Sequence, residues 1–270
     1  MSKTKSDLHQ YLDTLRARDQ RNLDNFFSRF EYIPCVRNKK VLDFGCGRGL
    51  LAHQIIRKGA SEVLGLDIDE EIVDYARLNI PIDVSSSKVN FTTKPITSLK
   101  GDYFDFIFSK DALEHCSDIE FVLSEFKRVL KPGGKVILGF GPLWNSPFGD
   151  HELLYSALGF KLPWLHLFLG DEVLKNLFNN SSMEPKQRVR KEKINSIENY
   201  LNKITLTQFF SKVEKESFEF VYKSVNAHQH SALSNLGKSK LLLRLGKYWE
   251  RNIYCVLEKK VETNSLKLSA

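Results

Sequence analysis

The chain has 270 residues, of which 42% are hydrophobic and 27% charged, and its formal net charge is +7 at pH 7. These values are ordinary for a folded globular protein, and a chain of this length can bury a substantial core. The sequence has no run of about 18 apolar residues and no apolar signal core at its N-terminus, so we expect neither a membrane span nor a secretory leader.

The first half of the chain alternates between strand-like and helix-like segments. Apolar residues at helical spacing predict an N-terminal helix over residues 6–30. Strands are predicted at residues 41–45, 62–67, 89–95, 103–109 and 135–140, and helices at residues 50–59, 70–80 and 119–130. The strands are mostly continuous apolar runs, which predicts an α/β fold with a doubly wound, mostly parallel sheet. Ligands of such sheets bind at the carboxyl edge of the strands.

The alternation stops beyond residue 141 and returns late. Residues 142–205 combine aromatic and proline-rich material with a charged helix, and we expect them to form a helical insert. A helix at 206–213, a strand at 218–228, a helix at 240–250 and a strand at 252–260 follow. We therefore expect five parts: an N-terminal helical cap (1–38), a cofactor-binding core (39–141), a substrate or lid insert (142–205), the C-terminal part of the sheet (206–260) and a tail (261–270).

Cysteines and positive charge bear on location and partners. The four cysteines are scattered and form no CxxC pair, so we expect neither disulfides nor a metal site, and the reducing cytoplasm is the expected location. The net charge fits either an anionic partner, such as nucleic acid or a membrane surface, or a lysine-rich surface in contact with solvent. We favour the second interpretation. The densest basic run, residues 186–193, has the pattern of an exposed helix start.

A glycine loop, GCGRG at residues 45–49, follows the first strand. Gly45 and Gly47 allow unusual backbone angles and close approach of a ligand to the backbone. Asp67 lies 20 residues beyond Gly47 at the end of the second strand, where an acid accepts hydrogen bonds from the ribose hydroxyls of a nucleoside. Asp43 precedes the loop, and a carboxylate there suits an ammonium ligand and repels a pyrophosphate.

Four motifs together resemble one family. LDFGCGRG, the acid in LGLDID, the strand FDFIFS leading into KDALEH, and EFKRVLKPGG resemble class I S-adenosylmethionine-dependent methyltransferases of type 11, over about residues 39–141. The resemblance implies S-adenosylmethionine as cofactor. It also implies a Rossmann-like sheet of seven strands, whose last strand is antiparallel and inserted between the fifth and sixth.

The resemblance further implies roles for particular residues in cofactor binding. These are Asp43, Gly45, Cys46 and Gly47 for the methionine moiety, Asp67 and Ile68 for the ribose and adenine, and Ser109 and Lys110 beside the methionine. Many relatives place an acid after the third strand to receive the adenine amino group, but this chain has TTKPITSL there. Backbone groups near Lys94 to Ile96 are expected to take that role.

Catalytic candidates are histidines near the active edge. Methyl transfer from a sulfonium depends mainly on positioning, and a base is needed only if the acceptor must lose a proton. We select His151, beside Asp150 in the apolar insert, as the base. His115 in ALEH is a second candidate, for which a structural role at a helix start carries equal weight, and His166 also lies near this edge. The aromatic residues of the insert either wall an acceptor pocket or pack on the sheet.

The leading hypothesis is an enzyme that methylates oxygen or nitrogen on a small-molecule, glycan or lipid-precursor acceptor. A non-catalytic protein that keeps the cofactor fold as a binding module is the alternative. A nucleic-acid methyltransferase is disfavoured, because the chain has no NPPY-like motif and no appended binding domain. Peripheral membrane contact stays open, since residues 241–249 could dock on an anionic surface but more simply cover the sheet. The acceptor and the oligomeric state do not follow from the sequence.

Overall fold

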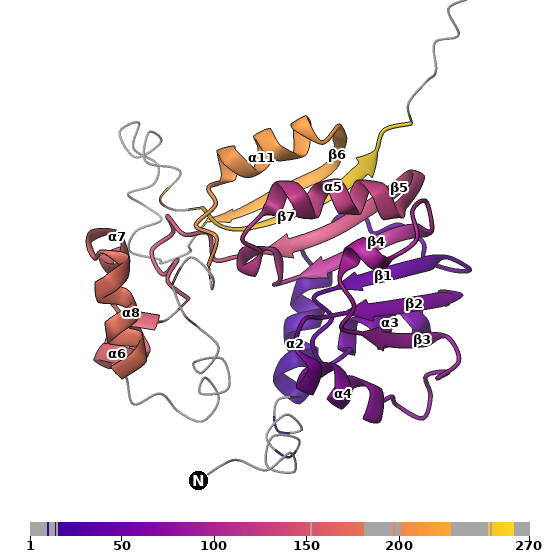
Figure 1. The fold of residues 1–270 in the computed structure, drawn as a ribbon, viewed down its shortest axis with the longest axis horizontal. Coiled ribbons are helices and arrows are strands. Elements are labelled where there is room, and N and C mark those ends of the chain that lie inside the picture. Colours follow the sequence, from indigo (N-terminus) through magenta and orange to yellow (C-terminus); the bar gives the residue numbers. More distant parts are fainter. Residues whose placement is uncertain are drawn as a thin grey trace, which may run out of the picture.

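The computed structural model describes residues 10, 14, 16–151, 153–180, 197, 201–227, 248 and 250–261. Within these residues, helices cover both faces of a seven-stranded sheet whose order is β3-β2-β1-β4-β5-β7-β6 (Figure 1). The strands are β1 (Lys40–Phe44), β2 (Glu62–Leu66), β3 (Val89–Thr92), β4 (Phe104–Lys110), β5 (Leu130–Phe140), β6 (Phe218–Ala227) and β7 (Glu250–Lys259).

Strand direction confirms the predicted fold class. β1 to β5 pair in parallel, whereas β7 pairs antiparallel with both β5 and β6. The last strand therefore lies between the fifth and sixth, as the family resemblance implies. The parallel strands end at a common edge, where the loops that follow β1, β2 and β4 meet.

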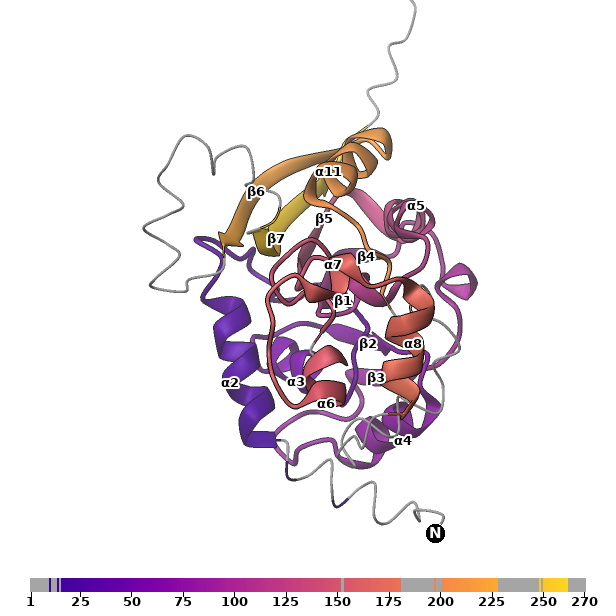
Figure 2. The same ribbon diagram turned by 90° about the vertical axis from the view of Figure 1, so that its left-hand side faces the viewer.

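Two hydrophobic clusters hold helices against opposite faces of the sheet. One face is covered by α2 (Arg16–Phe27), α3 (Leu50–Arg57) and α4 (Glu70–Leu78), and the other by α5 (Ile119–Val129) and α11 (Leu206–Lys215) (Figure 2). Val41 and Leu42 are neighbours on β1 and are fully buried in different clusters. Burial on both faces explains why this strand is a continuous apolar run.

Side-chain caps fix where several helices begin. The Asp69 carboxylate accepts hydrogen bonds from the backbone amides of Glu71 and Ile72, at the start of α4. Asp118 accepts one from the amide of Phe121 and begins α5. Thr205 begins α11 with a reciprocal capping box. Because these caps follow strand ends or loops, they fix where each connection at the carboxyl edge stops.

The described part of the insert, residues 142–151, 153–180, 197 and 201–205, lies beyond the edge at which the parallel strands end (Figure 1). Its described helices are α6 (Leu153–Leu158), α7 (Leu165–Phe168) and α8 (Asp171–Asn180). They share a small hydrophobic cluster of their own, made of Leu153, Leu154, Leu174, Ile197 and Leu201. The insert is therefore a helical layer placed over the edge where a ligand of the sheet binds.

Some sequence expectations lie partly or wholly outside the described residues. The N-terminal helix expected over residues 6–30 is described as α2, which ends at Phe27. The helix expected at 240–250 and the basic run at 186–193 fall mostly outside the described part of the chain. Among the residues that are described, no helix is long and apolar enough to cross a membrane.

Candidate functional site

The glycine loop is held tightly between neighbouring strands. Gly45, Gly47 and Gly49 all have positive φ angles, of 73°, 49° and 82°, which favour glycine. The backbone amides of Gly45 and Cys46 donate to the Leu66 carbonyl oxygen at 2.8 and 3.0 Å. The loop after β1 is thereby tied to the end of β2.

Two of the glycines have different surroundings. A Cβ atom on Gly45 would lie 2.3 Å from the Cβ of Ala112, in the loop after β4. At Gly47 a Cβ atom would meet no described protein atom within 4 Å. Gly45 thus permits close packing of two loops, while Gly47 leaves the backbone open toward a ligand.

A cavity of about 480 Å³ lies beside this loop, within the usual range for a small-molecule site. It is lined by α2, the glycine loop, the end of β2 and the loop after β4. Of the residues selected from the sequence, the cavity brings together Asp43, Gly45, Cys46, Gly47, Asp67, Ile68, Lys110 and His115.

Asp43 is a buried carboxyl at the cavity wall, with 1% of its surface exposed. Its Oδ2 atom has no hydrogen-bond partner among the described residues. Burial raises the pKa of Asp43 to about 7, against a backbone hydrogen bond from Ala52 that lowers it. A buried carboxylate with an unused oxygen is suited to a cationic partner, because such a partner offsets the cost of burying the charge.

Asp67 uses both carboxylate oxygens to order the loops around it. Its Oδ2 accepts from the amide of Gly47 at 2.9 Å, and its Oδ1 accepts from the amide of Asp69 at 3.1 Å. Each carboxylate oxygen can accept a further hydrogen bond, so the group can also receive hydroxyl donors. The neighbouring Ile68 side chain is 93% exposed at the cavity, where it offers an apolar surface.

Cys46 contributes packing at the cavity rather than a reactive thiol. Its side chain is buried, and burial raises the pKa of the thiol above its ordinary value, with Asp43 and Asp67 adding to the effect. The thiolate is the nucleophilic form, so this cysteine is a poor nucleophile.

Two of the residues selected for cofactor binding do not line the cavity. Ser109 is fully buried in β4, and its Oγ atom has no hydrogen-bond partner among the described residues. Ile96 begins the short 3-10 helix η1 (Ile96–Ser98), and its side chain lies in the core cluster on the α5 face. The Ile96 carbonyl oxygen accepts hydrogen bonds from Arg128 and Leu99. That carbonyl is already engaged within the protein.

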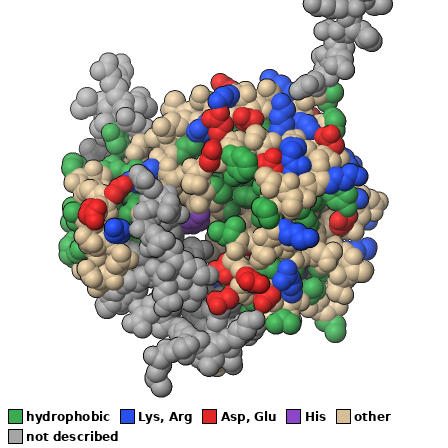
Figure 3. Space-filling model, in the orientation of Figure 1, with side chains coloured by type: hydrophobic (Ala, Val, Ile, Leu, Met, Phe, Trp, Pro, Cys, Tyr) green, Lys and Arg blue, Asp and Glu red, His purple; other side chains and the backbone are tan. Residues whose placement is uncertain are grey.

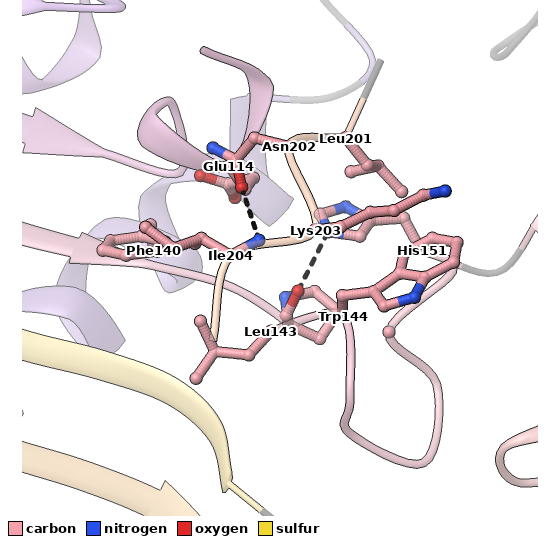
Figure 4. A pocket seen from close by; sticks show the side chains of 11 residues that line it. Glu114, Phe140, Leu143, Trp144, His151, Leu201, Asn202, Lys203 and Ile204 are labelled. Carbon is pink, nitrogen blue, oxygen red and sulfur yellow. Dashed lines mark hydrogen bonds between the residues drawn. The ribbon is translucent and has the colours of Figure 1, made fainter. Parts of the chain in front are cut away.

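The histidines meet at the boundary between the cavity and the insert. His115, in the 3-10 helix η2 (Leu113–His115), lines the large cavity, and its ring centroid lies 5.5 Å from that of His151. His151 lines a small pocket of about 10 Å³ (Figure 4), and its Nε2 atom lies 3.2 Å from the Pro142 carbonyl oxygen. The two rings therefore link the cavity to the pocket.

The Asp150 carboxylate contacts the start of α6 and a second histidine. Its Oδ2 accepts from the amide of Leu154 at 2.8 Å, and its Oδ1 lies 3.9 Å from Nδ1 of the buried His166. His151 has a positive φ of 54°. The Asp150 carboxylate therefore contacts the start of α6 and His166, and its expected cooperation with His151 stays a prediction.

Glu114 is a buried acid of this region that the sequence reasoning did not select. It lines the small pocket with His151, and its Oε2 atom has no hydrogen-bond partner among the described residues (Figure 4). Burial, and then the charge of Asp111, raise the pKa of Glu114 to about 8. The backbone amide of Asn202, in the insert, donates a hydrogen bond to the Glu114 carbonyl oxygen at 3.0 Å and so holds η2 in place. The only sequence signal was the place of Glu114 beside His115 in ALEH.

Known proteins share this combination of fold and sequence. Residues 42–138 match the family model described as a methyltransferase domain. The chain is 30% identical to the ubiquinone biosynthesis O-methyltransferase of Bartonella bacilliformis over 186 residues, which cover 66% of this chain and 73% of that relative. Identity to the enzyme of the same name from Bartonella tribocorum is 33% over 185 residues, with 65% and 73% covered.

Solved structures show the same fold. The S-adenosylmethionine-dependent methyltransferase from Mesorhizobium loti matches with a TM-score of 0.53 at 17% identity, covering 84% of this chain and 93% of that one. A putative S-adenosylmethionine-dependent methyltransferase from Listeria monocytogenes matches with a TM-score of 0.55 at 17% identity, covering 88% and 97%.

The sheet order, the glycine loop and the cavity at the carboxyl edge define a Rossmann-like α/β protein that binds a nucleoside cofactor. More particularly, the chain belongs to the S-adenosylmethionine-dependent methyltransferases of class I. It is an enzyme, and S-adenosylmethionine is its methyl donor.

Proposed function

We propose that this enzyme transfers the methyl group of S-adenosylmethionine to a hydroxyl oxygen of a small-molecule acceptor bound under the insert. This proposal rests mainly on three polar side chains that lie between the cofactor cavity and the insert: His115, His151 and Glu114. The relatives named as O-methyltransferases support oxygen as the methylated atom. A glycan or a lipid precursor remains a candidate acceptor, and the cytoplasm remains the predicted location.

The cofactor site is part of the same proposal. Asp43 would bind the ammonium group of the cofactor, since its buried Oδ2 has no partner among the described residues. Asp67 would accept hydrogen bonds from the ribose hydroxyls, with Ile68 against the adenine. The open backbone at Gly47, together with Gly45, Cys46 and Lys110, would border the methionine part. Ser109 and Ile96 would support the residues that line the cavity, because neither lines it directly.

The bound cofactor supplies a methyl group on a sulfonium sulfur, which an oxygen nucleophile attacks in line. The protein orients the acceptor and excludes water, and orientation can supply roughly 7–11 kcal/mol of the barrier. A hydroxyl must also lose its proton, and we propose that His151, next to His115, receives it. Family membership favours this activity over the non-catalytic binding module.

The proposed activity predicts methyl incorporation into a small hydroxylated compound. Purified enzyme is incubated with S-adenosylmethionine labelled in its methyl group and with a fractionated cell extract. We expect label in a low-molecular-weight fraction, and chemical blocking of hydroxyl groups in that fraction should abolish incorporation. Label that appears only in nucleic acid or protein would contradict the proposal.

The Asp43 assignment predicts that cofactor affinity depends on pH. With a pKa of about 7, Asp43 is mostly protonated at pH 6 and mostly ionised at pH 8, and only the ionised form attracts an ammonium group. Calorimetry should therefore show S-adenosylhomocysteine binding roughly tenfold more tightly at pH 8 than at pH 6. Asp43→Asn should bind weakly with a nearly constant affinity, which separates Asp43 from His115 at the same cavity. Equal pH dependence in both proteins would assign the titration to another group.

The histidine assignment predicts a loss of turnover without a loss of cofactor affinity. His151→Ala should lower kcat on the identified acceptor by about 10²–10⁴-fold, the usual contribution of a positioned base. Its dissociation constant for S-adenosylhomocysteine should not change, because His151 lines the small pocket rather than the cofactor cavity. His166→Ala is the matched control, since His166 is buried against Asp150. Full turnover of His151→Ala would leave positioning alone to explain the transfer.

Peripheral membrane contact also fits the outer face of the insert. Four large hydrophobic residues are exposed within one stretch of it: Tyr155, Phe160, Leu162 and Phe168. Figure 3 shows hydrophobic side chains at the left-hand edge of the molecule, on the side of the insert. Lys161 lies 4.8 Å from the ring centroid of Tyr155, which adds positive charge to the apolar surface. We propose that this stretch, residues 155–168, rests on an anionic lipid surface.

Vesicle co-sedimentation tests this contact. The protein should sediment with vesicles of phosphatidylcholine and phosphatidylglycerol, and less with phosphatidylcholine alone. Phe160→Ser combined with Phe168→Ser should reduce the bound fraction by roughly tenfold, because two aromatic side chains are no longer transferred from water to the lipid surface. Ile82→Ser removes an even more exposed apolar side chain elsewhere and should have no effect. Undiminished sedimentation of the double variant would contradict the proposal.

A further inference from the structure

The cofactor cavity is rich in acids and poor in cations. Its described lining includes five aspartates: Asp19, Asp43, Asp67, Asp69 and Asp111. The lysine and arginine side chains among the same described residues are Arg48 and Lys110. Each cation forms an ion pair with one of the acids, Arg48 with Asp19 and Lys110 with Asp111. An anionic group that enters this cavity therefore meets repulsion from several sides.

The cofactor brings such an anionic group. The amino-acid end of S-adenosylmethionine carries an ammonium group and a carboxylate, and Asp43 suits only the ammonium. The carboxylate needs a cation, and binding it requires one of the two existing ion pairs to yield. Arginine is the better candidate, because its planar fork donates two parallel hydrogen bonds to a carboxylate.

Position also favours Arg48 over Lys110. Arg48 follows Gly47 directly in the loop that is proposed to hold the methionine part, and its side chain is 17% exposed. Lys110 pairs with Asp111, the next residue in the chain, in the loop after β4 rather than in the glycine loop. The partner of Arg48 is Asp19 of a separate element, helix α2, so this ion pair joins the glycine loop to the helix.

We propose that Arg48 binds the carboxylate of the cofactor and that Asp19 of α2 competes for the same guanidinium when the cofactor is absent. Cofactor binding then exchanges one carboxylate for another on Arg48. Leu23 and Phe26 anchor α2 in the core, so the exchange requires movement only near Asp19. This inference rests on the proposed cofactor site and adds a residue to it that the sequence analysis did not select.

Two ligands separate a carboxylate contact from a general effect on the site. S-adenosylhomocysteine carries the amino-acid end, whereas 5′-methylthioadenosine has the same adenosine and thioether sulfur without it. Calorimetry with Arg48→Gln should show roughly tenfold to hundredfold weaker binding of S-adenosylhomocysteine. Binding of 5′-methylthioadenosine should stay within about twofold of the unaltered protein, because this ligand offers no carboxylate.

Two further variants control for charge and folding. Arg48→Lys keeps the charge and should recover part of the lost affinity for S-adenosylhomocysteine. Arg57→Gln breaks an ion pair with Asp83 away from the cavity and should change neither ligand's affinity. Thermal unfolding of each variant establishes that it is folded before binding is measured.

Asp19→Asn tests the competition directly. Removal of a negative charge from the rival carboxylate should tighten S-adenosylhomocysteine binding by roughly threefold or more, and should leave 5′-methylthioadenosine unchanged. Unchanged or weaker binding of S-adenosylhomocysteine would show that Asp19 does not compete.

The remaining outcomes distinguish this inference from the cofactor site itself. Equal weakening of both ligands in Arg48→Gln, or no weakening of either, would show that Arg48 does not bind the carboxylate. Failure of the unaltered protein to bind either ligand would instead overturn the proposed cofactor site, and this inference with it.

Discussion

The close approach of Gly45 to Ala112 is the contact on which the site depends. Only the absence of a Cβ at Gly45 lets the loop after β1 pack directly against the loop after β4. The first loop carries the cofactor cavity, and the second loop continues within three residues into Glu114 and His115. One glycine contact therefore brings the proposed donor side and acceptor side of the reaction together. Hydrogen bonds from Gly45 and Cys46 to Leu66, and from Gly47 to Asp67, fix β2 to the same point.

Two buried carboxyls flank this contact and share one physical property. Asp43 and Glu114 are both removed from water, each has an oxygen without a hydrogen-bond partner among the described residues, and burial raises the pKa of each, to about 7 and about 8. Such groups destabilise a protein unless a ligand or a proton compensates them. Their retention at the cavity and at the small pocket fits a site completed by its ligands. Arg48 and Asp19 line the same cavity, and their ion pair satisfies the charge of Arg48. In the proposed exchange, the cofactor carboxylate replaces Asp19 in that pair.

The sheet and the glycine loop were predictable because their signals are local. Continuous apolar runs give buried strands, and the spacing from Gly47 to Asp67 marks a nucleoside site. What the sequence does not reveal are contacts between distant parts of the chain. Adjacency predicts that Asp150 assists His151, but it does not predict that Asp150 also lies 3.9 Å from the buried His166. Glu114 and the Arg48–Asp19 pair depend on burial and on packing of α2, which no spacing in the sequence encodes.

The central claim is that the cavity beside the glycine loop binds the amino-acid nucleoside of a methyl donor and not a dinucleotide. Competitive calorimetry with S-adenosylhomocysteine and NAD tests this most directly. The account predicts micromolar or tighter binding of S-adenosylhomocysteine, equivalent to about −8 kcal/mol, and much weaker binding of NAD, because Asp43 repels a pyrophosphate. Tighter binding of NAD than of S-adenosylhomocysteine would contradict the account.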